Sequence, residues 1–185
     1  MKPEANQQFT DLKTLVKSRR AVREFSDLPI SDSDIKDIIE MAIWAPSASN
    51  MNARVFVVVR DKDRIRKIRA FSPGMFSEPK CIIVLCTDRQ KAFEVGGELG
   101  RDRASLMDIA VSAQNILLSA WSKGIGTCPL ASFNAPAIAR ILGLPDHIYP
   151  DLIITMGYPA SKPETPERPN IEDVMYYEQY GRKEV

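Results

Sequence analysis

The stretch RASLMDIAVSAQNILLSAWS, residues 103–122, decides the fold. Its apolar residues recur at three- and four-residue spacing over a wide band, which predicts a helix buried on most of its circumference. The band consists of Leu106, Ile109, Ala110, Ala113, Ile116, Leu117 and Ala120. We expect this to be the central helix of the domain, ended by the glycines Gly124 and Gly126.

Shorter periodic segments surround this helix. Amphipathic stretches predict further helices at 9–17, 32–43, 62–71 and 135–142, and apolar runs predict strands at 55–60, 81–87 and 152–157. Ser31 and Asn134 can cap the second and the last of these helices. Because helices and strands do not alternate regularly, we expect an α+β domain with a small mixed sheet rather than a doubly wound fold.

The chain changes character after Tyr158. Prolines occupy positions 159, 163, 166 and 169, and apolar and aromatic residues follow them. Proline at this density predicts an extended arm up to Asn170, whose aromatic end needs a surface to pack against. We expect one domain with a core at 1–158 and an arm at 159–185. From composition alone, the arm packs equally well on a partner subunit or on its own domain.

Composition excludes several function classes. The chain has 185 residues, 25 Lys plus Arg against 24 Asp plus Glu, a formal net charge of +1 and 44% hydrophobic residues. This balance argues against a nucleic-acid or membrane-surface partner and against a disordered chain. Three cysteines and the single histidine His147 predict neither a disulfide framework nor a metal site. With no apolar run of about 20 residues and no leader, we expect a cytoplasmic protein.

Several catalytic motifs are absent. No Gly-x-Ser-x-Gly elbow occurs, and His147 lies in a turn-like segment, so the sequence does not favour a hydrolase. The segment 96–100 lacks the Lys-Ser/Thr of a phosphate-binding loop, and 124–126 follows a helix instead of a strand.

Two polar features remain. Arg19, Arg20 and Arg23 form a basic cluster that can bind an anion, although the residues alone favour a solvated charge run at a helix C-terminus. Pro46-Ser47-Ala48-Ser49-Asn50 follows a predicted helix and offers small hydroxyl and amide groups to a ligand. Taken alone, that segment is a polar loop.

In this order, the motifs resemble those of the nitroreductase family of flavin-dependent reductases. The family's basic pattern appears as Arg19-Arg20-Ala21-Val22-Arg23-Glu24-Phe25, and its Pro-Ser-x-x-Asn loop as residues 46–50. The glycine turn after the long helix appears at 124–128, and Gly157-Tyr158-Pro159 follows the last core strand. The resemblance runs from about Lys17 to Arg168, and it implies a mostly antiparallel central sheet flanked by helices.

The resemblance also implies FMN at the interface of a homodimer. Arg19, Arg20 and Arg23, with Ala21 between them, would bind its phosphate and ribityl chain, and Arg168 on the arm would complete the phosphate site. The loop residues Pro46, Ser47, Ala48 and Asn50 of the partner chain would line the other side of the flavin. The backbone at Leu130, Ala131 and Ser132 would approach the ring.

Three positions depart from the family pattern. Ala21 stands where a serine is usual, and 71–76 lacks the Asn and Lys that some relatives place against the flavin. The loop continues Asn50-Met51-Asn52-Ala53-Arg54, so a cation replaces the usual tryptophan. Arg54 either alters the edge of the pocket or faces the surface.

The family resemblance implies an FMN-dependent oxidoreductase. Electrons would pass from NADH or NADPH to a nitroaromatic, quinone or similar flat acceptor in a ping-pong cycle, with the flavin and no side chain carrying the chemistry. Alternatives are a reductive dehalogenase or a flavin-degrading relative, and, from other classes, a non-catalytic flavin- or nucleotide-binding module or a dimeric interaction domain. Candidate pocket walls, or equally core residues, are Met51, Met75, Phe76 and Phe133.

Overall fold

The structure is a computed structural model that describes residues 11–184. Its elements are α1 (Leu12–Ser18), α2 (Asp32–Ile43), the short 3₁₀ helix η1 (Ala48–Asn50), β1 (Arg54–Val59), α3 (Lys62–Ala70), β2 (Cys81–Asp88), α4 (Arg89–Leu99), the π-helical turn η2 (Gly100–Ala104), α5 (Ser105–Ser122), β3 (Gly126–Leu130), α6 (Ala135–Leu142), β4 (Ile148–Gly157) and α7 (Ile171–Val174).

The strands form one sheet in the order β1-β2-β4-β3. All three pairings between these strands are antiparallel. The expected mixed, mostly antiparallel sheet is therefore antiparallel throughout its strands. Within residues 11–184, its parallel character is confined to an isolated bridge between Ala21 and Thr127.

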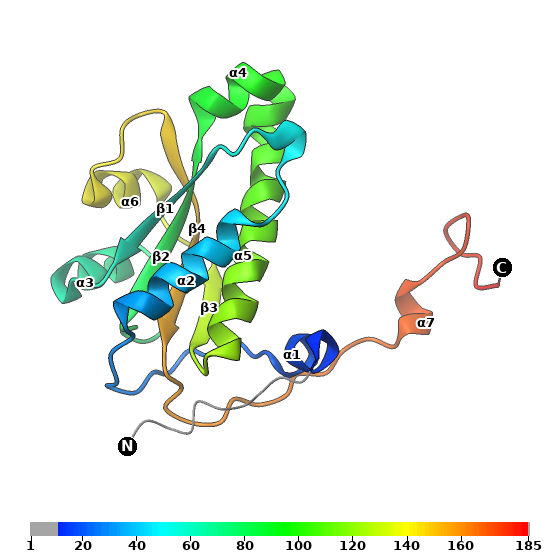
Figure 1. Ribbon diagram of the computed structural model, residues 1–185, viewed down its shortest axis with the longest axis horizontal. Coiled ribbons are helices and arrows are strands. Elements are labelled where there is room, and N and C mark those ends of the chain that lie inside the picture. Colours follow the sequence, from blue (N-terminus) through cyan, green and yellow to red (C-terminus); the bar gives the residue numbers. More distant parts are fainter. Residues whose placement is uncertain (1–10, 185) are drawn as a thin grey trace.

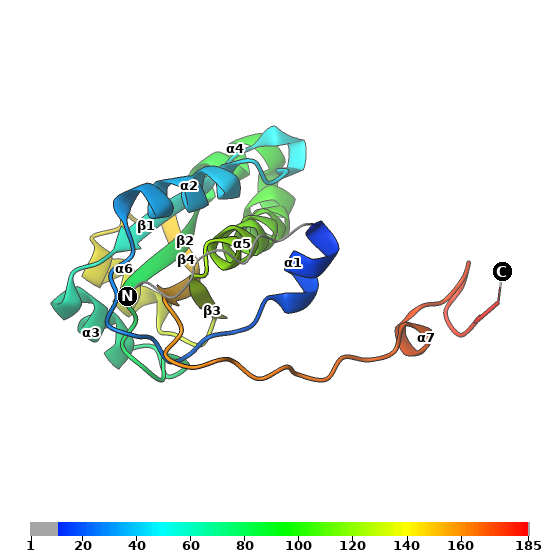
Figure 2. The ribbon, with the colours of Figure 1, turned by 60° about the horizontal axis from the view of Figure 1, so that its bottom comes forward.

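Both faces of this sheet are buried. Alternate residues of β2 face opposite layers, so that Ile83 packs among residues of α2 and α5, and Val84 packs among residues of α3 and α6. Figure 2 shows α2 and α5 on one side of the sheet and α3 and α6 on the other. Residues 81–86 are fully buried, because β2 lies inside the sheet and helices cover it on both sides.

Local capping sets the helix boundaries that the sequence predicted best. The Ser31 hydroxyl accepts a hydrogen bond from the Asp34 backbone N–H at 3.1 Å, and α2 spans Asp32–Ile43 as expected. The Asn134 side chain accepts from the Ala137 N–H at 3.0 Å, and α6 spans Ala135–Leu142 as expected.

The central helix is confirmed, with two corrections. The side chains of Ile109, Ala113 and Ile116 are buried, but Leu106 is 50% exposed and Ala110 is exposed as well, so the buried band is narrower than expected. Gly124, at φ 74°, follows the end of α5, whereas Gly126 begins β3 instead of ending the helix.

Helix α1 begins later than expected and lies outside the core. Its predicted apolar face included Phe9, which lies outside the described residues, and Leu12 and Val16, which are 69% and 47% exposed. Residues 11–184 therefore leave the face of α1 largely uncovered.

The C-terminal arm is extended, as the prolines predict. Figure 1 shows it leaving the domain after β4 and carrying the short helix α7 away from the body of the molecule. Several of its apolar side chains are exposed, since Ile171 is 60% exposed, Val174 62% and Tyr180 89%.

The basic segment 19–25 rests against two glycines of the sheet. A Cβ at Gly126 would lie 2.6 Å from the Val22 Cβ, and a Cβ at Gly157 would lie 2.7 Å from the Phe25 ring. Larger residues at these glycines would therefore push the segment away from the sheet.

We expect Gly126→Ala to destabilise the fold by about 1–3 kcal/mol, because the new methyl overpacks the contact with Val22. Chemical denaturation would measure this loss. Gly96→Ala is the matched control, because a Cβ there meets nothing within 4 Å, and helix propensity predicts a small gain. Equal stability of the two variants would contradict the close packing of the basic segment.

Candidate functional site

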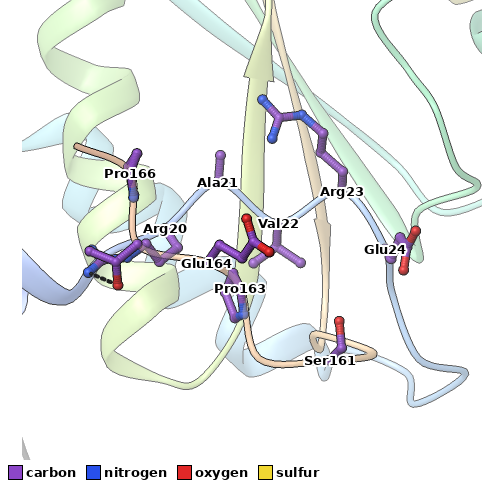
Figure 3. Close-up of a pocket in the computed structure, with 10 residues that line it drawn as sticks. Arg20, Ala21, Val22, Arg23, Glu24, Ser161, Pro163, Glu164 and Pro166 are labelled. Atoms are coloured by element: carbon purple, nitrogen blue, oxygen red, sulfur yellow. Dashed lines mark hydrogen bonds between the residues drawn. The ribbon is translucent and has the colours of Figure 1, made fainter.

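The basic segment follows α1 and runs beside the edge strand β3. The Val22 N–H donates to the Thr127 carbonyl at 2.9 Å, and this bond accompanies the bridge of Ala21 to the same strand. In an extended segment, successive side chains point to opposite sides. Figure 3 shows Ala21 and Arg23 pointing to one side and Arg20 turning toward the C-terminal arm.

Arg19 lies among other cations. Burial first, and then the charges of Arg168 and Arg20, lower the pKa of the Arg19 guanidinium. Within residues 11–184, the Arg19 side chain makes no hydrogen bond or ion pair. Because arginine stays protonated at neutral pH, the chain holds neighbouring positive charges here without a carboxylate between them.

Arg20 is already bonded to the chain. Its guanidinium donates to the Lys17 carbonyl at 2.7 Å, to the Arg19 carbonyl at 2.9 Å and to the Thr165 hydroxyl at 3.1 Å. The structure therefore separates the predicted arginine pair, because Arg19 is unpaired among the described residues and Arg20 ties the basic segment to the arm.

An open pocket of about 490 Å³ lies between the basic segment and the arm (Figure 3). It is lined by Arg20, Ala21, Val22, Arg23, Glu24, Ser161, Pro163, Glu164, Thr165 and Pro166. Its two acidic residues make this pocket less suited to an anion than the surroundings of Arg19 and Arg168.

The predicted ring-binding residues lie at the end of β3. Leu130 is buried, whereas Ala131 and Ser132 are exposed and line a shallow hollow of about 610 Å³ with Phe71 and Phe133. The backbone N–H groups of Ala131 and Ser132 donate to no acceptor within residues 11–184. They can therefore donate to a ligand.

Cys128 lies on β3 between Thr127, which pairs with the basic segment, and Leu130, which precedes the hollow. Its pKa is raised by burial, against the lowering charges of Arg23 and Arg19. Cations, a buried thiol and free backbone donors thus follow one another along the outer edge of β3.

The predicted loop 46–50 leaves α2 in a strained conformation. Ser49, Asn50 and Asn52 have φ values of 49°, 51° and 46°, in the left-handed region that non-glycine residues rarely adopt. Pro46 and Ala48 are exposed, as are Ser49 and Asn50. Strain of this kind persists only where surrounding contacts impose it.

Asp108 of α5 imposes part of this conformation. The carboxylate is 4% exposed and accepts from the Ser47 hydroxyl at 2.6 Å and from the Ala48 N–H at 3.0 Å. The Ser47 hydroxyl in turn accepts from the Asn52 N–H at 2.9 Å. Ser47 therefore bonds to the inside of its own loop, and its proton is not free for a ligand.

Arg54 also holds the loop in its strained conformation. Its guanidinium donates to the Ala45 carbonyl at 3.0 Å, to the Ser112 hydroxyl at 2.7 Å and to the Asn52 side chain at 2.9 Å. Arg54 is half-buried, and burial lowers its pKa. It thus binds the loop to α5 from a half-buried position, and an altered pocket edge at this residue stays a prediction.

The basic segment and the loop lie at opposite ends of α5. At one end the Trp121 indole donates to the Ser18 hydroxyl at 3.1 Å, and at the other end Asp108 holds Ala48. Residues 108 and 121 are about 20 Å apart along the helix axis at a rise of about 1.5 Å per residue. Figure 1 shows α1 and η1 near these two ends.

The four candidate pocket-wall residues fall into a buried pair and a more exposed pair. Met51 and Met75 are 3% and 5% exposed and belong to the core, whereas Phe76 is 69% exposed and Phe133 is half-buried. The two methionines therefore fill packing space, and only the phenylalanines can face a ligand.

Other chemistry-bearing residues are not gathered into a second site. Cys81 and Cys86 are buried, and burial raises each pKa to about 12. Among residues 11–184, no group of three or more His, Cys, Asp or Glu side chains could hold a metal ion. In the same part of the chain, no helix has the length and hydropathy to cross a bilayer.

Comparison with known proteins gives one consistent match. Residues 16–80 and 69–158 match the Nitroreductase family. A protein of Archaeoglobus fulgidus, named for a suggested NADH dehydrogenase or NAD(P)H nitroreductase activity, is 32% identical over 154 residues, which are 80% of this chain and 85% of that protein. An NADPH-flavin oxidoreductase of Vibrio harveyi is 26% identical over 88% of this chain and 72% of its own length.

A solved structure confirms the fold. The crystal structure of a nitroreductase family protein from Streptococcus pneumoniae superposes with a TM-score of 0.82 at 23% identity, over 89% of this chain and 98% of the other. The residues that match the family include the basic segment, the loop and the end of β3. This chain belongs to the nitroreductase family.

Proposed function

We propose that this protein is a homodimeric oxidoreductase that binds FMN and passes electrons from NADH or NADPH to a nitroaromatic, quinone or similar flat acceptor. Family membership confirms the expected enzyme class, a nitroreductase-type NAD(P)H oxidoreductase. The choice of FMN, the acceptor and the ping-pong order belong to the proposal.

The observation that carries the proposal is the unneutralised charge around Arg19. Its guanidinium lies near those of Arg168 and Arg20 and pairs with no carboxylate within residues 11–184. A phosphate with about two negative charges would relieve this repulsion through charge-assisted hydrogen bonds. The donor set therefore fits the phosphate end of FMN.

The end of β3 fits the ring end. The free N–H groups of Ala131 and Ser132 can donate to a ring nitrogen, and the neighbouring Phe133 offers an apolar contact. Bound FMN would supply the electron transfer, which needs no side-chain acid or base from this chain. The protein's part is to bind the phosphate, orient the ring and leave one face open to substrates.

A second copy of the chain completes the proposed site. Because the loop 46–50 and Arg19 lie at opposite ends of α5, one cofactor meets both only if two chains contribute. An exposed apolar surface on α2 and α5 supports this association, and the Asn115 side chain joins the two helices by donating to the Met41 carbonyl at 2.9 Å. The exposed apolar surface comprises Met41, Ile43, Trp44, Leu106, Met107 and Val111.

The same reasoning extends to the arm and to location. We propose that 159–185 packs on the partner subunit, because its apolar end is exposed on its own chain. The proposed compartment is the cytoplasm, supported by three buried cysteines that remain free thiols.

Steady-state turnover tests the activity. With FMN bound, NADH or NADPH oxidation should depend on a nitroaromatic or quinone acceptor, and double-reciprocal plots at several acceptor concentrations should be parallel, as a ping-pong cycle requires. Oxidation no faster than with free FMN would favour a binding module instead. Loss of flavin absorbance during turnover would favour the flavin-degrading alternative.

Replacing Arg19 tests the phosphate assignment. Arg19→Ala should raise the dissociation constant of FMN by about ten- to hundredfold, because charge-assisted bonds to the phosphate are lost. Riboflavin, which lacks the phosphate, should bind almost as before. Fluorescence titration measures both flavins, and Arg64→Ala on α3 is the matched control. Equal weakening of FMN and riboflavin would contradict the assignment.

A mixed dimer tests the shared site. One chain carries Arg19→Ala and the other carries Ala48→Glu, which places a bulky carboxylate on the exposed side of the loop. If each site combines two chains, one site joins two intact halves, and the mixed dimer should bind about one flavin. If each chain builds its own site, the mixed dimer should bind none. Each variant homodimer serves as a control.

A further inference from the structure

We propose that Asp108 and Arg54 are positioning residues that hold the loop 46–50 in its ligand-binding shape before any flavin arrives. This inference rests on the proposed function, because it gives Asp108 and Arg54 a role in the flavin site that acts through the loop. The proposed role is to shape the loop, and it is separate from phosphate binding at Arg19.

The loop would not adopt its shape unaided. Three non-glycine residues, Ser49, Asn50 and Asn52, have positive φ values within four positions, and each such residue costs free energy relative to the usual backbone regions. Their side chains are exposed, so core packing does not compensate this cost. The Asn52 side chain compensates part of it by donating to the Asn50 carbonyl at 3.0 Å and side-chain oxygen at 2.7 Å. Bonds on the inner side of the loop supply the rest.

Asp108 supplies bonds of the required strength and direction. Both carboxylate oxygens are used, one by the Ser47 hydroxyl at 2.6 Å and one by the Ala48 N–H at 3.0 Å. A buried carboxylate is costly unless its oxygens are bonded, so the loop and the charge stabilise each other. Because Asp108 is only 4% exposed, it can act on a flavin only through the loop.

Arg54 closes the network from the other side. Its guanidinium spans the Ala45 carbonyl before the loop and the Asn52 side chain after it, while Ser112 fixes the same group to α5. The Ser112 hydroxyl in turn donates to the Asp108 carbonyl at 2.8 Å. Through Arg54, both ends of the loop are thereby held to the turn of α5 that contains Asp108 and Ser112.

This arrangement assigns Ser47 an indirect role. Its hydroxyl donates to Asp108 and accepts from the Asn52 N–H, so it joins the carboxylate to the strained backbone. The exposed loop groups, those of Ala48, Ser49 and Asn50, remain for the flavin of the partner chain. Preorganisation of this kind raises affinity by removing an ordering cost from the binding step.

The test compares two flavins on purified dimeric variants. Asp108→Asn should raise the dissociation constants of FMN and riboflavin by the same factor, about ten- to hundredfold, because the loop meets the ring side rather than the phosphate. The visible spectrum of the residual bound flavin should shift as the loop's environment changes. Asp151→Asn is the matched control, a half-buried carboxylate that accepts from the Thr87 hydroxyl at 2.7 Å and bonds to no loop residue within the described chain, and it should leave both constants unchanged.

A double-mutant cycle tests the link through Ser47. Ser47→Ala combined with Asp108→Asn should bind flavin about as weakly as Asp108→Asn alone, because both changes break one connection. Additive losses would show that Ser47 meets the flavin directly and would overturn the proposal.

Ser112→Ala keeps the proposal falsifiable if Asp108→Asn does not fold. Ser112 is fully buried and cannot touch a ligand, yet its loss should weaken both flavins by about two- to tenfold through Arg54. Variants that lose unfolding free energy while keeping wild-type flavin affinity and spectrum would reduce Asp108 and Arg54 to ordinary structural roles. Failure of the wild-type protein to bind either flavin would instead overturn the proposed function, and this inference with it.

Discussion

The burial of β2 on both faces is the constraint on which the rest of the molecule depends. A strand that is covered above and below and paired at both edges needs two helical layers, and α5 is the longest helix of those layers. The rigid length of α5 then fixes how far apart its two ends lie. Every polar feature proposed for the flavin site is attached near one of those ends or along the edge of β3.

The contrast between the two ends of α5 explains how one small domain would contribute to two sites in the proposed dimer. Near the C-terminal end, the Arg19 guanidinium lies beside other arginines and pairs with no carboxylate within residues 11–184, which suits the phosphate proposed to bind there. At the N-terminal end, the Asp108 carboxylate and the Arg54 guanidinium bond within the chain and shape the loop 46–50. One end therefore offers electrostatic attraction, and the other offers a preformed surface.

Much of the fold could be read from the sequence where local and tertiary signals agree. The α2 boundaries follow from Ser31 and the acids after it, and β2 follows from an uninterrupted apolar run. Strand β3 escaped because Gly126 and Pro129 leave too little β-branched character in five residues. Helix α4 was not predicted because Gly96 and Gly97 interrupt a polar stretch. The exposure of Leu106 was not predicted because the periodicity of a helix does not reveal which residues pack against it.

The site was only partly predictable for a related reason. Arg19 and the loop 46–50 carry recognisable motifs, whereas Asp108 is a single acid within an apolar helix, and no spacing rule marks it. Arg54 was marked as a departure, but its partners are largely backbone carbonyls and a serine distant in sequence. Sequence patterns indicate which groups are present and do not indicate which backbone atoms they will meet.

The position of β4 has a consequence for how the chain reaches its native state during synthesis. Strand β2 ends at Asp88, but its second neighbour begins at Ile148, so this pairing waits until α4, α5, β3 and α6 have left the ribosome. Pairings of such long sequence separation slow folding and leave an apolar edge uncovered in the meantime. A nascent chain halted before β4 would therefore leave one edge of β2 exposed to chaperones or to aggregation. The sheet is complete only when β4 pairs with both β2 and β3.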